Sequence, residues 1–314
     1  MPIGSPIDSS PPKTAQKSDS SKKAEKIQWT VSEPRYSISD VILNPETMRQ
    51  LLDVISYFQN KDMLFREWGL QEKYANRDGL AVNLYGLPGT GKTMAAHAIA
   101  KELNLPMICV DYADIESKYV GETSKNLSSL FKTATEQNAA IFFDEADALL
   151  SKRVTNMTSA TDVSVNQTRS VLLNLLNDYR GVILFATNFI QNFDAAFLRR
   201  IRYHVQFRLP DRDLREKLWR TYIPARMPCE VDYADLAEKF DGISGSDIAN
   251  AVFSAAVSAA RDKKSTVKQI RFENAIRHAL AVKKANEGNN HGVTVEKRIL
   301  SAEEAREKLR MMEE

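Results

Sequence analysis

Short apolar runs alternate with amphipathic stretches along the middle of the chain. Each apolar run has the length of a buried strand, and the stretches between the runs have helical spacing. The expected strands are 81–85, 106–110, 140–143, 182–186 and 205–207, and the helices expected among them are 93–103, 127–135 and 170–179. Continuous apolar strands separated by helices predict a five-stranded parallel sheet that is covered by helices on both faces.

The strand pattern stops after Leu209-Pro210-Asp211, and only helical patterns follow. These helices are expected over 214–222, 233–240, 246–261 and 272–282. A chain of 314 residues suits two domains. We therefore expect an α/β domain over 27–210 and a smaller all-helical domain over 211–285, followed by an extension with a terminal helix over 286–314.

The first 26 residues differ in composition from the rest. They contain six Ser, four Pro and five Lys and no aromatic residue. Such a segment buries too little apolar surface to offset the entropy lost on ordering, so we expect a disordered arm. It has neither the apolar middle of a secretory signal nor the arginines of a mitochondrial presequence. A solvated tail and a docking segment for a partner both remain open.

Composition narrows the class of protein further. The chain is 43% apolar and 27% charged, its mean hydropathy is −0.37, and it contains no apolar stretch of about 18 residues, so no membrane span is expected. A net charge of +2 gives little reason to expect a nucleic-acid partner. Cys109 and Cys229 are too few for a disulfide framework or a zinc site, and we expect two reduced thiols in a cytoplasmic protein.

The strongest chemical signal is Gly86-Leu87-Pro88-Gly89-Thr90-Gly91-Lys92-Thr93, which fits the phosphate-loop pattern G-x-x-x-x-G-K-[ST]. It lies between an expected strand and an expected helix, where backbone N–H groups and the helix N-terminus can hold phosphates. Lys92 is expected to contact the β and γ phosphates, and Thr93 to bind Mg²⁺. The predicted cofactors are ATP and Mg²⁺, with the contacts made by Pro88, Gly89, Thr90, Gly91, Lys92, Thr93 and Met94.

An acidic pair follows the expected strand 140–143. Ligands bind at the carboxyl ends of strands in open α/β sheets, so Asp144 is predicted to bind Mg²⁺ and Glu145 to polarise the attacking water. The letters Asp144-Glu145-Ala146-Asp147 also spell the signature of DEAD-box RNA helicases. That reading requires a second strand-and-helix lobe and a Ser-Ala-Thr motif, whereas this chain has a helical second region and Phe185-Ala186-Thr187-Asn188.

As a set, these motifs resemble the AAA family of AAA+ ATPases, from about Ser39 to Ala281. Phe185-Ala186-Thr187-Asn188 resembles sensor 1, which implies that Asn188 helps to hold the attacking water or the γ-phosphate. The segment 194–200 resembles the one that carries arginine fingers, here Arg199 and Arg200, and Leu209-Pro210-Asp211 resembles the exit into a lid. The segment 242–248 resembles the lid motif beside the nucleotide, which implies contacts from Gly245 and Ser246.

The resemblance also implies an assembly. Arginine fingers act on a neighbour's ATP, so the family's homohexameric ring is expected here. Lys118, Tyr119 and Val120 resemble the first pore loop, whose aromatic side chain grips polypeptide without reading its sequence. A polar segment over 155–165 is then expected to be a second, mobile loop lining the same channel.

Three functions are compatible with such a core. A protein remodeller or unfoldase that acts on polypeptide is favoured by the pore-loop aromatic and the near-neutral charge. A nucleic-acid machine, such as a helicase loader or clamp loader, is the alternative. A nucleotide-gated scaffold is disfavoured because Lys92 and Glu145 are both present. Among compact AAA remodellers, the size and the short arm favour those that open HORMA-domain proteins in bacterial anti-phage systems, although the motifs do not select this substrate.

Overall fold

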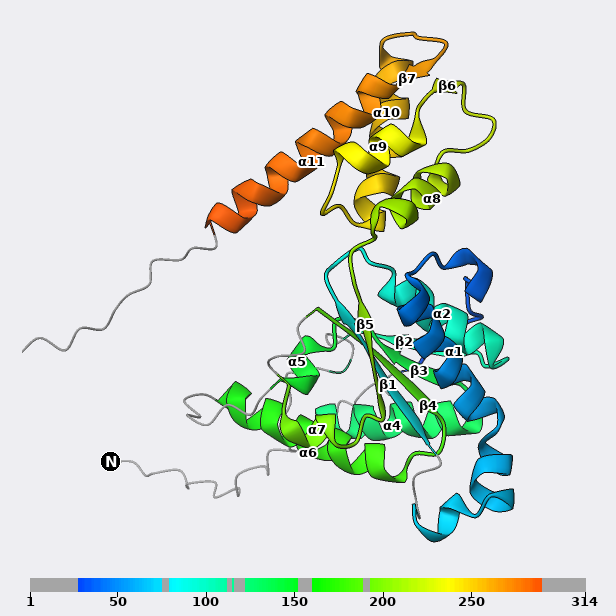
Figure 1. Ribbon diagram of the computed structural model, residues 1–314. Coiled ribbons are helices and arrows are strands. Elements are labelled where there is room, and N and C mark those ends of the chain that lie inside the picture. The colour runs from blue at the N-terminus through cyan, green and yellow to red at the C-terminus, as the bar shows by residue number, and fades with distance from the viewer. Residues whose placement is uncertain are drawn as a thin grey trace, which may run out of the picture.

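The computed structural model describes residues 28–74, 79–111, 115, 122–151, 160–188 and 193–289. Within these ranges the chain forms an α/β region and, after it, a smaller and mainly helical region (Figure 1). The expected N-terminal arm over 1–26 lies outside the described residues, and so does the extension after residue 289.

The α/β region is built on five parallel strands, as predicted. These are β1 (Leu80–Gly86), β2 (Met107–Val110), β3 (Ala140–Phe143), β4 (Val182–Thr187) and β5 (Tyr203–Phe207), in the order β2-β3-β4-β1-β5. The chain passes from β1 to the edge at β2, returns through β3 and β4, and then crosses to β5 on the other side of β1. This change of direction opens a crevice at the carboxyl ends of the central strands, where open α/β sheets bind their ligands.

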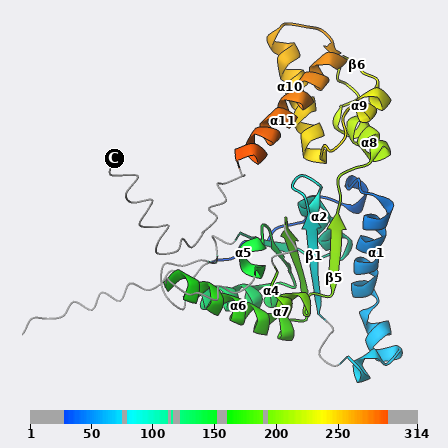
Figure 2. The ribbon, with the colours of Figure 1, turned by 60° about the vertical axis from the view of Figure 1, so that its left-hand side comes forward.

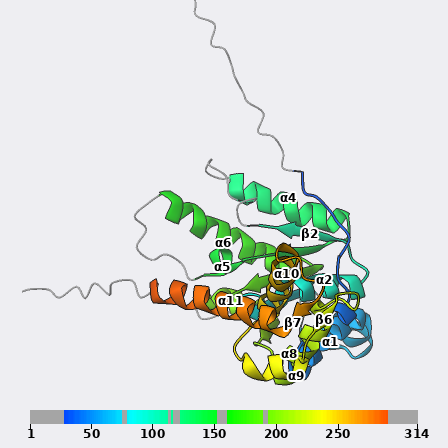
Figure 3. The ribbon, with the colours of Figure 1, turned by 90° about the horizontal axis from the view of Figure 1, so that it is seen from above.

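Helices cover both faces of the sheet. Val82 and Leu84 point into one apolar core, which contains residues of α1 (Pro45–Gln59) and α2 (Lys92–Glu102). Ile183 and Phe185 point into the other core, on the side of α4 (Glu122–Glu136), α6 (Ala160–Asp178) and α7 (Ala195–Leu198). Figure 3 shows α1 and α2 on one side of the sheet and α4 and α6 on the other. Burial on both faces explains why the strands have continuous apolar sequences.

Several elements of this region lie outside the pattern of the expected strands and helices. Before β1 come η1 (Ile38–Asp40), α1, η2 (Met63–Glu67) and η3 (Leu70–Glu72), and after β3 comes α5 (Asp147–Leu150). The N-cap residue of α1 is Asn44, whose side chain accepts a hydrogen bond from Thr47 N at 2.8 Å. Asn-Pro before a helical stretch is a start signal of the usual kind, so this helix could have been predicted.

The smaller region contains α8 (Arg212–Tyr222), α9 (Tyr233–Lys239), α10 (Gly245–Arg261) and α11 (Gln269–Asn289), close to the predicted helices. It also contains one short parallel pairing, between β6 (Cys229–Glu230) and β7 (Val267–Lys268), which an all-helical description omits. Its own apolar core includes Trp219 and Phe272, whose rings meet edge to face at 6.1 Å. Figure 2 shows this region, called the lid below, beyond the carboxyl ends of β1 and β5.

Two expected boundaries are wrong in detail. Helix α11 continues through the boundary expected after residue 285 and ends at Asn289. Helix α6 begins at Ala160, so residues 160–165 are helical and not part of a loop, while 155–159 lie outside the described residues. The sequence Ser159-Ala160-Thr161-Asp162 has the spacing of a capping box, a start signal that the polar composition conceals. None of the helices in the described ranges is long and apolar enough to cross a bilayer.

Candidate functional site

The phosphate loop connects β1 to α2, as the motif predicts. Helix α2 begins at Lys92, and its N-cap is Gly91, which has no side chain to cap the helix. The first N–H groups of a helix have no partner within the helix, so at this end they are available to an anion. The loop is tightened by Thr90, whose Oγ1 donates to the Leu87 carbonyl at 2.8 Å. A phosphate chain is the natural ligand for such a backbone.

Lys92 is buried at this loop, with 8% of its surface exposed. Its Nζ donates to the carbonyls of Gly86 at 2.8 Å and Leu87 at 3.0 Å, and to Asn188 Oδ1 at 2.9 Å. Burial lowers the pKa of Lys92, and Asp144 and Asp147 act in the opposite direction. The structure therefore brings the lysine of the loop and the sensor-like asparagine at the end of β4 into direct contact.

Thr93 and Asp144 form an oxygen pair beside the loop. Thr93 Oγ1 donates to Asp144 Oδ2 at 3.0 Å, and the other oxygen of Asp144 accepts from Glu145 N at 3.0 Å. A hydroxyl and one carboxylate match the protein ligands of Mg²⁺ at nucleotide sites, where phosphate and water oxygens complete the shell. The described residues contain no group of three His, Cys, Asp or Glu side chains that could hold a metal by themselves. This donor set fits Mg²⁺ bound together with a nucleotide.

Glu145 lies next to this pair in an unusual backbone conformation. Its φ is +48°, in the left-handed region that residues with a Cβ rarely occupy. Its side chain is exposed and lines the same cavity as Lys92 and Thr93. Strained backbone of this kind is found preferentially at functional positions.

The lid closes the other side of the loop. Ser244 caps α10 through a reciprocal capping box with Asp247, and Ser246 N donates to the Gly89 carbonyl at 3.2 Å. Gly89 has φ +75°, and a Cβ placed on it would lie 2.6 Å from Ser244 Oγ. Only glycine allows this contact between the loop and the lid.

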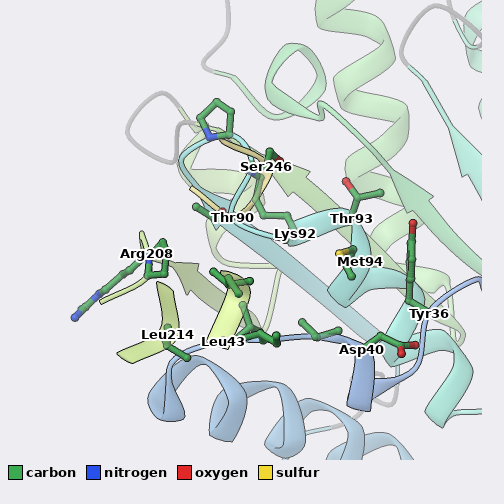
Figure 4. A pocket seen from close by; sticks show the side chains of 18 of the residues that line it. Tyr36, Asp40, Leu43, Thr90, Lys92, Thr93, Met94, Arg208, Leu214 and Ser246 are labelled. Carbon is green, nitrogen blue, oxygen red and sulfur yellow. The ribbon is translucent and has the colours of Figure 1, made fainter. Parts of the chain in front are cut away.

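Loop and lid together enclose a cavity of about 740 Å³, within the usual size range of small-molecule sites. Figure 4 shows Lys92, Thr93, Thr90 and Ser246 around it. The predicted nucleotide-site residues that line it are Pro88, Gly89, Thr90, Gly91, Lys92, Thr93, Met94, Asp144, Glu145, Asn188, Gly245 and Ser246. The structure thus gathers in one place the residues that were predicted to contact the chain's own nucleotide.

One wall of this cavity was not predicted from the sequence. It consists of Tyr36, the segment 39–44, Arg208, Pro210, Leu214, Leu218, Thr221 and Tyr222. Tyr36 is held by the buried His97, whose Nδ1 accepts from Arg35 N at 3.3 Å and whose ring meets the tyrosine ring edge to face at 5.8 Å. In Figure 4 the Arg208 side chain extends away from the phosphate loop. The available signals for this wall were the start of the family resemblance near Ser39 and the lid exit at Leu209-Pro210-Asp211 with the helix expected after it.

Arg199 and Arg200 are not part of this cavity. They follow α7 and precede β5, and Arg202 N binds the Ala81 carbonyl at the amino-terminal end of β1. The phosphate loop starts at Gly86, five residues further along β1, or about 16 Å at about 3.3 Å per residue. The two arginines are exposed, and they lie near the amino-terminal ends of the strands, away from the phosphate loop. Lys118, Tyr119 and Val120 lie outside the described residues, so their predicted pore role stays a prediction.

Two family models match the chain. The ATPase family associated with various cellular activities (AAA) matches residues 82–210, and the AAA+ lid domain matches residues 230–274. One similar protein is the ATP-dependent zinc metalloprotease FtsH of Ureaplasma parvum, 28% identical over 271 residues, which are 84% of this chain and 36% of the relative. Proteasome-activating nucleotidase 1 of Haloferax volcanii is 32% identical over 242 residues, 74% of this chain and 58% of the relative. The proteasome-activating nucleotidase of Saccharolobus islandicus is 32% identical over 259 residues, 80% of this chain and 64% of the relative.

The chain thus spans between about a third and two thirds of the length of these relatives. The AAA match contains the phosphate loop, the acidic pair, Asn188 and the arginine pair, and the lid match contains Gly245 and Ser246. Both matches agree with the two regions of the fold and with the cavity between them. The chain belongs to the AAA family of ATPases, with an AAA domain followed by an AAA+ lid domain, and uses ATP with Mg²⁺.

Proposed function

We propose that this chain is a protein-remodelling motor that works as a homohexameric ring and pulls on polypeptide through its central pore. The names of its relatives, a metalloprotease and a proteasome-activating nucleotidase, connect ATP with the processing of proteins and support a polypeptide substrate. A HORMA-domain protein as that substrate stays a prediction.

The observation that carries the ring is the position of the arginine pair. Arg199 and Arg200 are exposed near the amino-terminal ends of the strands, and the ATP cavity of the same chain opens at their carboxyl ends. They therefore have no route to their own phosphates, but each pair is available to a second copy. Guanidinium groups supplied by a neighbour stabilise charge on the transferring phosphoryl group.

The two arginines differ in their contacts. Arg200 Nε donates to Asn177 Oδ1 at 2.9 Å, and its Nη1 donates to the Ala196 carbonyl at 3.0 Å. The side chain of Arg199 makes no hydrogen bond or ion pair within the described residues, so it is free to extend, while its backbone N–H donates to the Ala195 carbonyl. The nearby Arg202 lies over the ring of Tyr57, 4.6 Å from its centroid, on the other face of the sheet. We assign the main finger to Arg199 and a supporting role to Arg200.

Hydrolysis follows from the residues around the cavity. Lys92 and the N–H groups of α2 hold the phosphates, and Asn188 holds the γ-phosphate or the water in place. Glu145 accepts a proton as the water oxygen bonds to the γ-phosphorus and the bond to the β-phosphate oxygen breaks, which yields ADP and phosphate. Mg²⁺, bound through Thr93 and Asp144, supplies positive charge to the phosphate oxygens.

Coupling to motion runs through the lid. Its capped helix α10 contacts Gly89 directly, so a change in the loop when the γ-phosphate leaves reaches the whole helical region. Tyr119 would transmit the resulting movement to polypeptide in the channel. The alternative, a nucleic-acid machine, would hydrolyse ATP in the same way but would be stimulated by nucleic acid and not by polypeptide.

A mixing experiment tests the shared site. A chain with Arg199→Ala and Arg200→Ala and a chain with Lys92→Ala should each hydrolyse little ATP alone. Mixed one to one, they should regain activity, because about one interface in four of a randomly assembled symmetric ring combines an intact loop with an intact finger. Arg49→Ala, at an exposed position on α1, is the matched arginine control and should keep normal turnover.

No regained activity on mixing would mean that each site is completed within one chain. The substrate class is tested separately, by adding unfolded polypeptide or DNA to the wild-type protein and measuring ATP turnover. Stimulation by polypeptide that Tyr119→Ala removes would agree with the proposal. Stimulation by DNA alone would favour the nucleic-acid machine.

A further inference from the structure

A row of three polar side chains crosses the sheet where the strands are otherwise apolar. Thr187 on β4, Asn83 on β1 and His204 on β5 lie on neighbouring strands, and Asn83 is paired in register with His204. Asn83 is completely buried, and its Oδ1 accepts from Thr187 Oγ1 at 3.2 Å. Residues paired in register point to the same face of a sheet, here the face on the side of α6 and α7.

Two atoms of this row have unmet hydrogen-bonding capacity. Asn83 Nδ2 and His204 Nδ1 are buried, and neither has a partner among the described residues. Native proteins pair the great majority of buried polar atoms, so each exception calls for an explanation. One of these atoms is a donor, the other is able to accept, and their residues are register partners.

The state of the His204 ring follows from its surroundings. Burial, the largest effect, lowers the pKa of His204 below its usual value, while the backbone of Leu198 and of Ile201 acts to raise it. The ring is therefore neutral at neutral pH. Its Nε2 lies 3.4 Å from the Leu198 carbonyl, which can only accept, so the proton is on Nε2 and Nδ1 carries the lone pair.

The row connects two functional positions. At one end, Thr187 directly precedes Asn188, which holds Lys92 in the ATP site of this chain. At the other end, His204 contacts the turn from Leu198 to Ile201, which carries Arg199 and Arg200. The side chains of the row thus span the sheet from the chain's own ATP site to the arginines that it offers to a neighbour.

We propose that Asn83 and His204 are positioning residues for the finger turn. Neither atom has a partner among the described residues of this structure, and a hydrogen bond from Asn83 Nδ2 to His204 Nδ1, once made, fixes the ring against the Leu198 carbonyl and so holds Arg199 in reach of the neighbouring ATP. Adjacent strands are about 4.8 Å apart, so side-chain rotation alone can make or break this bond. This inference rests on the proposed action of the arginines on a second copy.

The test is a mutant cycle in the full-length protein, followed by ATP turnover. Asn83→Leu and His204→Leu should each lower kcat about 10- to 100-fold, as small displacements of catalytic groups do, with KM for ATP within about twofold. His204→Gln, which keeps a donor and an acceptor, should retain most of kcat. Gln206→Leu, two residues along on the same face of β5, is the matched control and should behave as wild type.

The cycle separates this inference from the proposed function. In a chain that already has Arg199→Ala and Arg200→Ala, adding Asn83→Leu should change kcat no further, because the residue acts through the fingers. The positioning role would be overturned if Asn83→Leu lowered kcat of the double arginine variant by the same factor as it lowers kcat of the wild type. It would also be overturned if Asn83→Leu alone kept full kcat. If the double arginine variant itself keeps full kcat, the proposed function fails first.

Thermal melting distinguishes a loss of positioning from a loss of folded protein. Asn83→Leu replaces a half-paired buried amide with an apolar group of similar size, so its melting temperature should equal or exceed that of the wild type. A lower kcat at undiminished stability supports positioning. A fall in kcat that only follows loss of folded protein, in both Asn83→Leu and His204→Leu, would overturn it.

Discussion

Gly89→Ala probes the contact between the phosphate loop and the lid, and Gly242→Ala provides its control. Both glycines have a left-handed backbone, with φ of +75° and +72°. An added Cβ at residue 242 meets nothing within 4 Å, whereas at residue 89 it lies 2.6 Å from Ser244 Oγ and 2.8 Å from Ser246 Oγ. The pair therefore shares backbone strain and differs in the space around the new methyl group.

The magnitudes follow from these contacts. Left-handed strain costs roughly 1–2 kcal/mol per residue with a Cβ, so both variants should lose about that much stability toward unfolding. At residue 89 the lid must also move off the loop or Ser244 must rotate, which costs the bond from Ser246 N, the N-cap of α10, or both. Each is worth about 1 kcal/mol, so ATP should bind roughly 5- to 30-fold more weakly.

Titration calorimetry with a non-hydrolysable ATP analogue and Mg²⁺ measures the affinity, and urea unfolding measures the stability. Gly242→Ala should keep Kd within about twofold of the wild-type value. Its backbone strain is the same with and without nucleotide, so the strain does not change the free energy of binding. Equal Kd values for the two variants would refute the view that the lid contact contributes to nucleotide binding.

Three further predictions concern single side chains. Glu145→Gln should keep ATP binding and slow phosphate release by about 10²–10⁴-fold, and normal turnover would exclude the general-base role. Arg215→Met should lower the free energy of unfolding of the lid, measured in urea, by about 2–3 kcal/mol, because the buried guanidinium binds the carbonyls of Pro210 and Ala237 and the Asp241 carboxylate. The control Arg212→Met, at an exposed position, should cost under about 0.5 kcal/mol. Similar losses in the two variants would contradict this reasoning. Burial lowers the pKa of His97 below 6.5 in the folded state, so its contribution to stability is complete above pH 6.5 and is lost as the pH falls through the lower folded value. His97→Gln should flatten this acid-induced loss in melting experiments, although His204 has a shift of the same sign and will leave part of it.

Much of the sheet was predictable because its strands are buried on both faces. Ala140–Phe143 has four buried apolar residues in a row, and its observed bounds agree with the expected ones. Strand β5 was expected to begin at 205, but it begins at Tyr203, since the half-buried Tyr203 and His204 break the apolar run. An apolar run in the sequence therefore predicts a buried strand. Where a strand such as β5 has polar positions, its limits depend instead on its pairing with β1.

The candidate site divides in the same way. The phosphate loop, the acidic pair and Asn188 are contiguous motifs, so their positions in the sequence already identify them. Tyr36 and Tyr222 reach the cavity from different regions of the chain, and only tertiary packing brings them together. Asn83 gives no local signal beyond a polar residue in a strand, and its relation to His204 follows from the strand order.

The left-handed backbone of Glu145 has a consequence for evolution and engineering. Glycine, and to a lesser degree asparagine, accept such a conformation more readily than glutamate does. A library of variants selected only for heat resistance should therefore accumulate Gly or Asn at residue 145, whereas selection for turnover should retain Glu. Comparing the two enriched populations by deep sequencing would show how much thermal robustness the molecule forgoes at this one position.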